Sequence, residues 1–171
     1  RPDRIRQIAQ SIDADPLKVL KNIFVARAFN SDHQILLIDK INEMIKNGEP
    51  IKLVIIDSLT AHFRAEFAGR GQLADRQQKL NRYLHNLMRM AEANNLAIFV
   101  TNQVMANPAV MFGDPTTAVG GNILAHASTY RLYFRRGKAG SRVAKLIDSP
   151  NLPDNEAQFY LTEAGIRDEE A

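Results

Sequence analysis

Two short runs of apolar residues constrain the fold of this chain more than any other feature. One run is Leu53–Ile56, and the other covers residues 96–101. Unbroken apolarity, in place of alternation, is typical of parallel strands that are covered on both faces. Between the runs, Leu80, Leu84 and Leu87 recur at helical spacing within residues 72–94. A strand, a helix and a second strand in this order predict an α/β domain with a parallel sheet.

Flanking segments extend this pattern at both ends. Helix starts are expected at Pro2 and at Asp15-Pro16, because proline is tolerated in the first helical turn and aspartate caps it. A further helix is expected over residues 31–47 and a buried strand over residues 23–26. Runs at 131–134 and 143–146 flank glycines and predict a hairpin, followed by a strand at 158–161. The predicted fold is therefore a parallel sheet flanked by helices, with an antiparallel β extension at the C-terminal end.

Composition excludes several classes of protein. The chain has no Cys, which excludes a disulfide framework, thiolate zinc sites and cysteine nucleophiles. No apolar segment approaches the roughly 20 residues that span a bilayer. No apolar stretch follows Arg1-Pro-Asp-Arg4, so a signal peptide is not expected. We expect a protein of the cell interior, neither secreted nor bound to a membrane.

Charge is distributed unevenly along the sequence. The formal net charge is +3, but residues 61–142 hold 11 basic and 4 acidic residues, a balance of +7. Residues 143–171 hold 2 basic and 7 acidic residues, a balance of −5. A strongly basic segment can be the binding surface for a polyanion such as nucleic acid. A solvated basic helix explains the charge equally well.

The residues that end the two apolar runs are candidates for chemistry. Asp57 closes the first run, and Thr101-Asn102-Gln103 closes the second. In open α/β sheets, ligands bind at the carboxyl ends of the strands. A carboxylate there can hold Mg²⁺ through water, and a glutamine can hydrogen-bond a terminal phosphate. Polar residues that only cap a turn at the end of a strand have the same sequence pattern, so neither motif alone shows that a nucleotide binds here.

Two glycine-containing segments follow these strand ends. The first carries Arg64 and Gly69-Arg70-Gly71, with Arg76 in the next helix. The second, residues 103–121, is rich in glycine, proline and asparagine and reads as a long loop, a length that is usually functional or disordered. Arginine on a glycine-flanked loop can contact phosphates through its side chain and through backbone N–H groups. Phe112 could wedge between bases, although such loop residues more often cover the edge of a domain.

Eight segments occur in a fixed order along the chain. They are Leu53–Ser58, Phe63-Arg64, Gly69–Gly71, Arg76–Leu80, Phe99–Val104, Phe112–Pro115, Gly120–His126 and Asp148–Pro153. Together they closely resemble the ATPase core of the RadA recombinases of archaea and their eukaryotic strand-exchange relatives, in the RecA superfamily. The resemblance covers essentially all of the chain. It implies a RecA-like fold and an ATP-dependent recombinase that forms filaments on single-stranded DNA and performs homologous pairing and strand exchange in DNA repair.

The resemblance also implies roles for individual residues on the nucleotide side. Asp57 corresponds to the carboxylate on the Mg²⁺ side of ATP. Gln103 and His126 correspond to the catalytic residues that sense the terminal phosphate and couple it to DNA. Arg4 corresponds to the arginine that stacks on adenine, and Pro153 to the cap over the ATP of a neighbouring protomer. Asp148 and Asp154 are expected near that ATP's phosphates, with a monovalent cation between them.

Further residues are implied in binding DNA and partner proteins. The first DNA loop corresponds to Arg64, Arg70 and Arg76. The second, over residues 105–119 and the glycine that follows, includes Met105, Asn107, Phe112, Gly113 and Gly120. An apolar pocket that receives a Phe-x-x-Ala element, from the next subunit or from a mediator protein, corresponds to Ala26, Leu37, Ile41 and Met44; plain core packing is the alternative for these four. The implied partners are single- and double-stranded DNA, further copies in a filament or ring, and mediators, in the cytoplasm of an archaeon or the nucleus of a eukaryote.

One family motif does not occur in these residues. The 171 residues contain no Gly-x-x-x-x-Gly-Lys-Ser/Thr, the loop that cradles nucleotide phosphates. We therefore expect a single RecA-like core domain over residues 1–171 that lacks its N-terminal part, namely the phosphate loop, the first strands and the catalytic glutamate. A non-catalytic recombinase-like module that binds DNA or a mediator peptide is the alternative function. A remoter one is another RecA-like ATPase, such as a helicase or clock protein.

Overall fold

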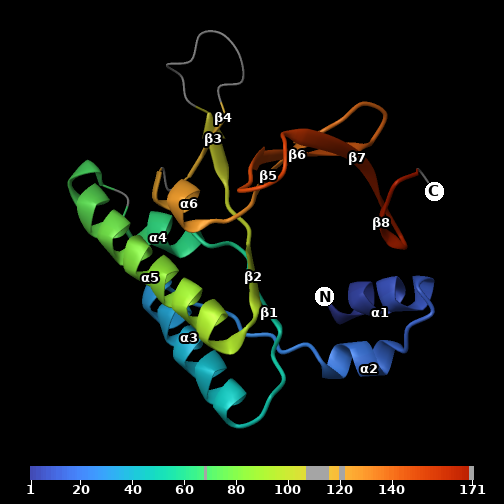
Figure 1. Ribbon diagram of the computed structural model, residues 1–171, viewed down its shortest axis with the longest axis horizontal. Coiled ribbons are helices and arrows are strands. Elements are labelled where there is room, and N and C mark those ends of the chain that lie inside the picture. Colours follow the sequence, from blue (N-terminus) through green and yellow to red (C-terminus); the bar gives the residue numbers. More distant parts are fainter. Residues whose placement is uncertain (68, 107–115, 120–121, 170–171) are drawn as a thin grey trace. The chain divides into compact units, whose positions relative to one another are not determined.

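The computed structural model describes residues 1–67, 69–106, 116–119 and 122–169 (Figure 1). Its contacts divide the chain into two compact units. The larger unit is Ala26–Ala127, and the smaller unit combines Arg1–Val25 with Ser128–Ala171.

The larger unit contains the predicted parallel sheet. Strand β1 (Leu53–Ile56) pairs in parallel with β2 (Ala97–Val100), with Leu53 opposite Ala97. The helices are α3 (Ser31–Lys46), α4 (Ala61–Glu66), α5 (Leu73–Asn94) and α6 (Asn122–Ala127), and a 3₁₀ turn, Arg70–Gln72, precedes α5. Two further strands, β3 (Val104–Ala106) and β4 (Thr116–Ala118), form an antiparallel ribbon. The prediction of an α/β fold with a helix-flanked parallel sheet is confirmed.

Local sequence explains where the two long helices begin and end. Asn30 caps α3, its side-chain oxygen accepting from the backbone N–H of His33 at 2.7 Å, and Gly48 follows the helix at a φ of 94°. Asn95, in the left-handed conformation, is the C-cap that follows α5. One face of α5 repeats buried residues and builds the core with α3 and the sheet. The main buried residues are Ile38, Val54, Leu59, Phe63, Leu80, Tyr83, Leu84, Leu87, Met90 and Leu96.

The two faces of the parallel sheet differ in burial. Val54 is buried in the core, and Ile56, Ile98 and Val100 pack against it. On the other face Leu53, Ile55 and Phe99 are 53%, 62% and 46% exposed. The expectation that both faces are covered is therefore wrong for this structure, because the helices that pack on the sheet here cover one side.

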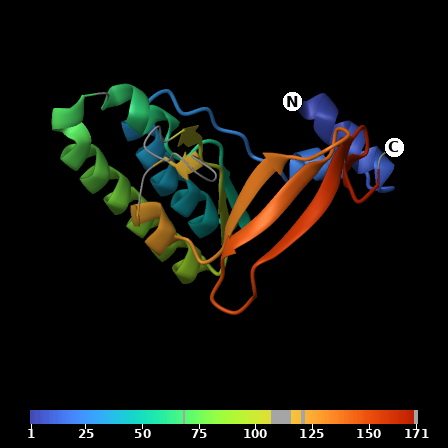
Figure 2. The same cartoon turned by 90° about the horizontal axis from the view of Figure 1, so that it is seen from above.

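The smaller unit contains the predicted antiparallel extension. Strands β5 (Arg131–Arg136), β6 (Arg142–Asp148), β7 (Asn155–Thr162) and β8 (Gly165–Arg167) pair in sequence order, and Figure 2 shows the twist of this sheet. Helices α1 (Pro2–Ser11) and α2 (Pro16–Lys21) start at the predicted prolines. Helix α1 contacts the β7–β8 turn, where the Ser11 hydroxyl lies 3.1 Å from the carbonyl of Ala164.

Several sequence expectations need correction. Residues 23–26 form no strand, and Phe24 and Val25 are 57% and 86% exposed. A strand needs a neighbour to pair with its N–H and C=O groups, and no described strand pairs with this segment. The polar segment at 58–70, which is expected from its sequence to be a loop, contains α4, and the segment expected to be a loop from 103 to 121 includes the β3–β4 ribbon. None of the described helices is both long and apolar enough to cross a membrane.

Candidate functional site

The carboxyl ends of β1 and β2 place Asp57 beside Thr101. The Thr101 hydroxyl donates to Asp57 Oδ1 at 2.6 Å. Backbone bonds fix the same edge, since the N–H of Leu59 donates to the carbonyl of Thr101 at 2.9 Å and the N–H of Thr101 to that of Ile56 at 3.0 Å. Asp57 is exposed, and no described residue donates to its second oxygen, Oδ2. One carboxylate oxygen is therefore held in place while the other can accept a ligand.

A second contact joins two residues that the sequence assigned to different roles. The Arg64 Nη1 of α4 donates to Gln103 Oε1 at 3.0 Å, although the two residues are 39 positions apart. Gln103 is exposed, and its amide NH₂ group has no partner among the described residues. A guanidinium on the amide oxygen orients the amide, so that its N–H donors can meet an anion. The structure thus brings the expected phosphate sensor next to an expected DNA-loop arginine.

The chemistry of this edge fits a magnesium ion that has few protein ligands. Within the described ranges, no group of three or more His, Cys, Asp and Glu side chains gathers as a metal site would. Mg²⁺ keeps several waters and is commonly bound by one or two carboxylates together with substrate phosphates. Asp57 offers one free oxygen, and the buried hydroxyl of the adjacent Ser58 has no hydrogen-bond partner. These residues fit such an ion only in company with nucleotide oxygens and water.

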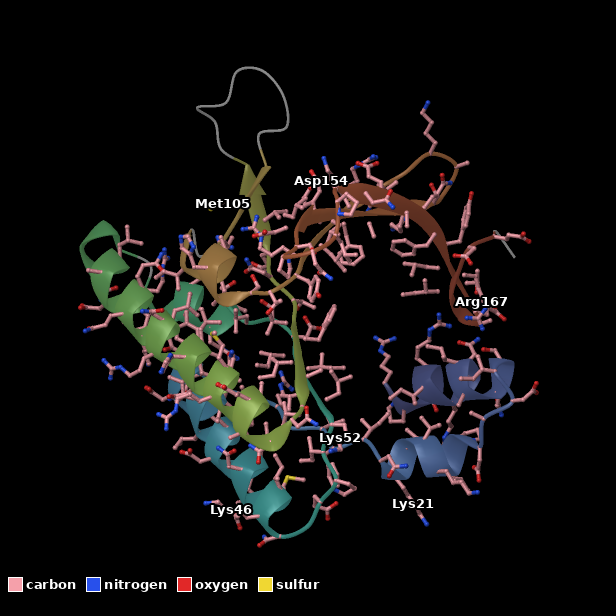
Figure 3. All side chains as sticks on the ribbon, viewed as in Figure 1. Lys21, Lys46, Lys52, Met105, Asp154 and Arg167 are labelled. Carbon is pink, nitrogen blue, oxygen red and sulfur yellow. The ribbon has the colours of Figure 1, made fainter. Side chains whose placement is uncertain are left out.

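The other expected nucleotide- and DNA-site residues that the structure describes in the larger unit lie on α6, on α5 with its preceding 3₁₀ turn, and on β3. His126 is exposed on α6, and no hydrogen bond between described residues joins it to Gln103. Arg76 is half-buried in the first turn of α5, and the backbone of Arg70 begins the 3₁₀ turn. Met105 is exposed on β3, labelled in Figure 3. Four expected DNA contacts, at Asn107, Phe112, Gly113 and Gly120, lie outside the described residues.

The expected adenine-stacking residue, Arg4, is held by backbone groups of its own unit. Its Nη1 donates to the carbonyl of Glu163 at 2.6 Å and its Nη2 to the carbonyl of Thr162 at 2.5 Å. Nη1 also lies 2.7 Å from Oε1 of Gln7. These bonds use donors in the guanidinium plane and fix its orientation, which suits a group that stacks on an aromatic ring through its face.

The β6–β7 connection carries the three residues expected to cap ATP. Asp148 ends β6, and Pro153 and Asp154 immediately precede β7. All three are exposed, and Asp154 is labelled in Figure 3. Arg131 Nε lies 3.9 Å from Asp148 Oδ2. The Ser149 hydroxyl accepts from the N–H of Leu152 at 3.0 Å, so the turn is held by its own residues.

Comparison with known proteins identifies the family of the chain. A model of the Rad51 family matches residues 1–169. The chain belongs to the Rad51 family. A DNA repair and recombination protein RadA from Methanocorpusculum labreanum is 54% identical in an alignment of 181 residues, which covers 98% of this chain and 55% of that protein. The chain thus spans about half the length of the curated relative it matches, and the resemblance to RadA recombinases is confirmed.

The four apolar residues expected to form a partner pocket do not share one environment. Leu37, Ile41 and Met44 lie on one face of α3 and are half-buried, and Ile41 packs against the core. Ala26 is exposed in a segment without regular structure. A groove between α3 and α5 has a volume of about 380 Å³, but its lining includes none of the four. For Ile41 the structure therefore supports core packing.

The basic segment of this Rad51-family chain divides between the two units. Of its 11 basic residues, six lie before residue 128 together with all 4 acidic residues, a balance of +2. The other five lie at 131–142, with no acidic residue among them. Most of the excess charge therefore belongs to the β5–β6 hairpin and not to the two expected DNA loops. The hairpin was not identified from the sequence as a basic surface, although the basic residues of Arg135-Arg136-Gly137-Lys138 at a predicted hairpin turn indicate one.

Proposed function

We propose that this chain is part of an ATP-dependent recombinase that assembles on single-stranded DNA and carries out homologous pairing and strand exchange. One observation carries the proposal. At the ends of two adjacent parallel strands, Asp57 is held by Thr101, and Gln103 is held by Arg64. Membership of the family supports assigning the first pair to the nucleotide and the second to coupling between nucleotide and DNA.

On the nucleotide side, the residues of this chain bind and sense ATP. The free oxygen of Asp57 holds a Mg²⁺ ion through water, and that ion, when bound, neutralises phosphate charge. Gln103 directs its amide N–H toward the terminal phosphate, and His126 acts as the second sensor. Arg4 stacks on the adenine ring. Pro153 covers the ATP of a neighbouring protomer, with Asp148 and Asp154 holding a monovalent cation beside it.

On the DNA side, two loops and a hairpin contribute to DNA binding through basic side chains or through accessible backbone N–H groups. Arg70 belongs to the first loop, with Arg64 on α4 before it and Arg76 on α5 after it. Met105 lies at the start of the second loop, which also includes Asn107, Phe112, Gly113 and Gly120. A Cβ atom added at Gly69 would meet one atom, at 3.9 Å, and one at Gly71 would meet none within 4 Å. The fold of the chain does not itself need glycine there, and glycine leaves the backbone N–H groups open to phosphates. The basic β5–β6 hairpin supplies a further surface for a polyanion such as duplex DNA.

Assembly and partners complete the proposal. Copies of the protein associate into a filament or ring, with ATP at each interface. Mediator proteins bind through a Phe-x-x-Ala element at the half-buried face of α3 that includes Leu37 and Met44, with Ala26 nearby in sequence. Since the substrate is chromosomal DNA, the proposed location is the cytoplasm or nucleus.

The test is DNA-stimulated ATP hydrolysis by the complete gene product. Wild-type protein is expected to hydrolyse ATP faster when single-stranded DNA is added. Gln103→Ala should lose most of that stimulation, because the amide that links phosphate to Arg64 is gone. Gln78→Ala, an exposed glutamine on α5, is the matched control and should keep it. Wild-type protein without stimulation, together with a silent Gln103→Ala, would contradict the proposal.

The non-catalytic alternative predicts a different result in the same assay. A recombinase-like module that binds DNA without hydrolysis should retain salt-dependent DNA binding and show no ATP turnover. The absence of a Gly-x-x-x-x-Gly-Lys-Ser/Thr motif from these 171 residues favours testing it. Turnover by the complete gene product would discard it.

A further inference from the structure

The residue between Thr101 and Gln103 connects the strand edge to two other segments. Asn102 Oδ1 accepts from the Thr60 hydroxyl at 2.8 Å, and its Nδ2 donates to the carbonyl of Val119 at 2.6 Å. Both partners are buried, with exposures of 1% for Thr60 and 5% for Val119. One side-chain amide therefore satisfies a buried hydroxyl and a buried backbone carbonyl at the same time.

These two partners lie at the bases of the two candidate DNA loops. Thr60 directly precedes α4, and its carbonyl accepts from the N–H of Arg64 at 3.0 Å. Val119 directly follows β4, and its own N–H donates to the carbonyl of Gln103 at 2.9 Å. The amide of Asn102 is thus bonded at one end to the segment that leads to the first loop. Its other end is bonded to the segment that closes the second.

We propose that Asn102 is a positioning residue that holds the bases of both DNA loops in register with the edge carrying Asp57 and Gln103. This inference rests on the proposed function, because it assumes that the two loops bind DNA and that the edge senses nucleotide. Asn102 contacts neither DNA nor nucleotide in this account. It acts through Thr60 and Val119, so that a shift of the strand end at Gln103 moves both loop bases together.

The chemistry of the contact is specific to asparagine. The position needs an acceptor and a donor on one short planar group, and a side-chain amide provides both. Aspartate has the same size and keeps the acceptor for Thr60, but it has no N–H for the Val119 carbonyl. Threonine to valine at position 60 removes the other bond while preserving the size of the side chain. The two bonds can therefore be broken separately.

The experiment measures single-stranded DNA binding by the complete gene product with a non-hydrolysable ATP analogue and with ADP. Wild-type protein should bind DNA more tightly with the analogue. Asn102→Asp is expected to reduce that ratio of affinities at least tenfold, with affinity for the analogue unchanged, and Thr60→Val should give a smaller loss of the ratio. Asn94→Asp is the matched control, because Asn94 Nδ2 makes the same kind of bond, to the carbonyl of Met90 at 2.9 Å, away from the strand edge. It should lower the melting temperature without changing the ratio.

Each outcome decides between positioning and a merely structural role. An unchanged ratio in Asn102→Asp overturns the proposal, and so does a parallel fall of nucleotide affinity, DNA affinity and melting temperature. If Asn102→Asp does not fold, Thr60→Val decides alone, and a wild-type ratio in that variant overturns the proposal.

The proposed function can fail independently of this inference. Wild-type protein that binds no DNA contradicts the proposed function, not the role of Asn102. In that case amide hydrogen exchange at Val119 and Arg64 still tests the positioning. Faster exchange at Val119 in Asn102→Asp and at Arg64 in Thr60→Val supports it, and wild-type exchange at both overturns it.

Discussion

Removal of the Glu66 side chain should destabilise the larger unit, because this carboxylate bonds to a buried residue of another helix. Its Oε1 accepts from the backbone N–H of Ser31 at 2.6 Å, and its Oε2 accepts from the Ser31 hydroxyl. Ser31 is completely buried at the start of α3, and its hydroxyl also accepts from Lys79 Nζ at 2.7 Å. The carboxylate at the end of α4 thus serves as an external cap for α3, where the helix dipole favours negative charge.

The magnitude follows from these contacts. Hydrogen bonds to a charged group contribute about 1.5–3 kcal/mol each. Glu66 makes two of them, but its side chain is 31% exposed, so water can partly replace the carboxylate. The Lys79 contact at 4.0 Å adds little. Glu66→Ala should therefore lower the free energy of unfolding by about 2–4 kcal/mol, whereas Glu66→Gln keeps an acceptor oxygen and should lose about half of that.

The assay is denaturant unfolding of the complete gene product, followed by circular dichroism. Glu43→Ala is the matched control on α3, the helix that Glu66 caps, since Glu43 pairs with Lys40 at 2.9 Å but both side chains are more than half exposed. That exposed pair should contribute less than about 0.5 kcal/mol. Equal losses in Glu66→Ala and Glu43→Ala would refute the reasoning, because they would mean that burial of Ser31 adds nothing to the cap.

Tyr83, Arg70 and His126 each give a further test. Burial raises the pKa of Tyr83 above its ordinary 10.0, partly offset by a hydrogen bond from Gln34. The unfolded chain then loses this proton first, so stability should fall as the pH rises above about 10, and unfolding curves of Tyr83→Phe should lack that fall. Arg70→Ala should weaken binding to single-stranded DNA with little change in melting temperature and reduce the salt slope by about 0.7, whereas an unchanged slope counts against a phosphate contact. His126→Ala should keep its melting temperature, because the side chain is exposed, yet lose ATP-dependent strand exchange; full exchange activity would argue against the sensor role.

Sequence patterns predicted the elements whose signals are local. Helix α5 follows from the spacing of Leu80, Leu84 and Leu87, and β1 and β2 follow from unbroken apolar runs. The β5–β6 hairpin follows from the glycines at its turn. The helices α4 and α6 were missed because their six residues carry too little helical periodicity. The prediction of a strand at 23–26 was wrong for another reason. A strand needs a neighbouring strand to pair with, and the sequence of the segment does not show whether one is present.

Residues for the candidate site could be proposed from the sequence, but the contacts between them could not. Asp57 and Gln103 could be chosen because they end apolar strands. The pairing of Asp57 with Thr101 and of Gln103 with Arg64 could not be predicted, since contacts across 44 and 39 positions depend on the fold. The division of positive charge between the two units could not be predicted either, because only the fold assigns residues 131–142 to a different unit from the loops.

The side chains of the three consecutive polar residues after β2 alternate in the partners that they contact. The geometry of extended backbone explains this alternation. Successive side chains of extended backbone point to opposite sides. Thr101 and Gln103 accordingly reach Asp57 and Arg64, the residues proposed to meet nucleotide and DNA, whereas Asn102 between them reaches the bases of the two loops. Substitutions at 101 and 103 should therefore change the response to nucleotide directly. A substitution at 102 should leave nucleotide binding intact and change only what the loops do with it.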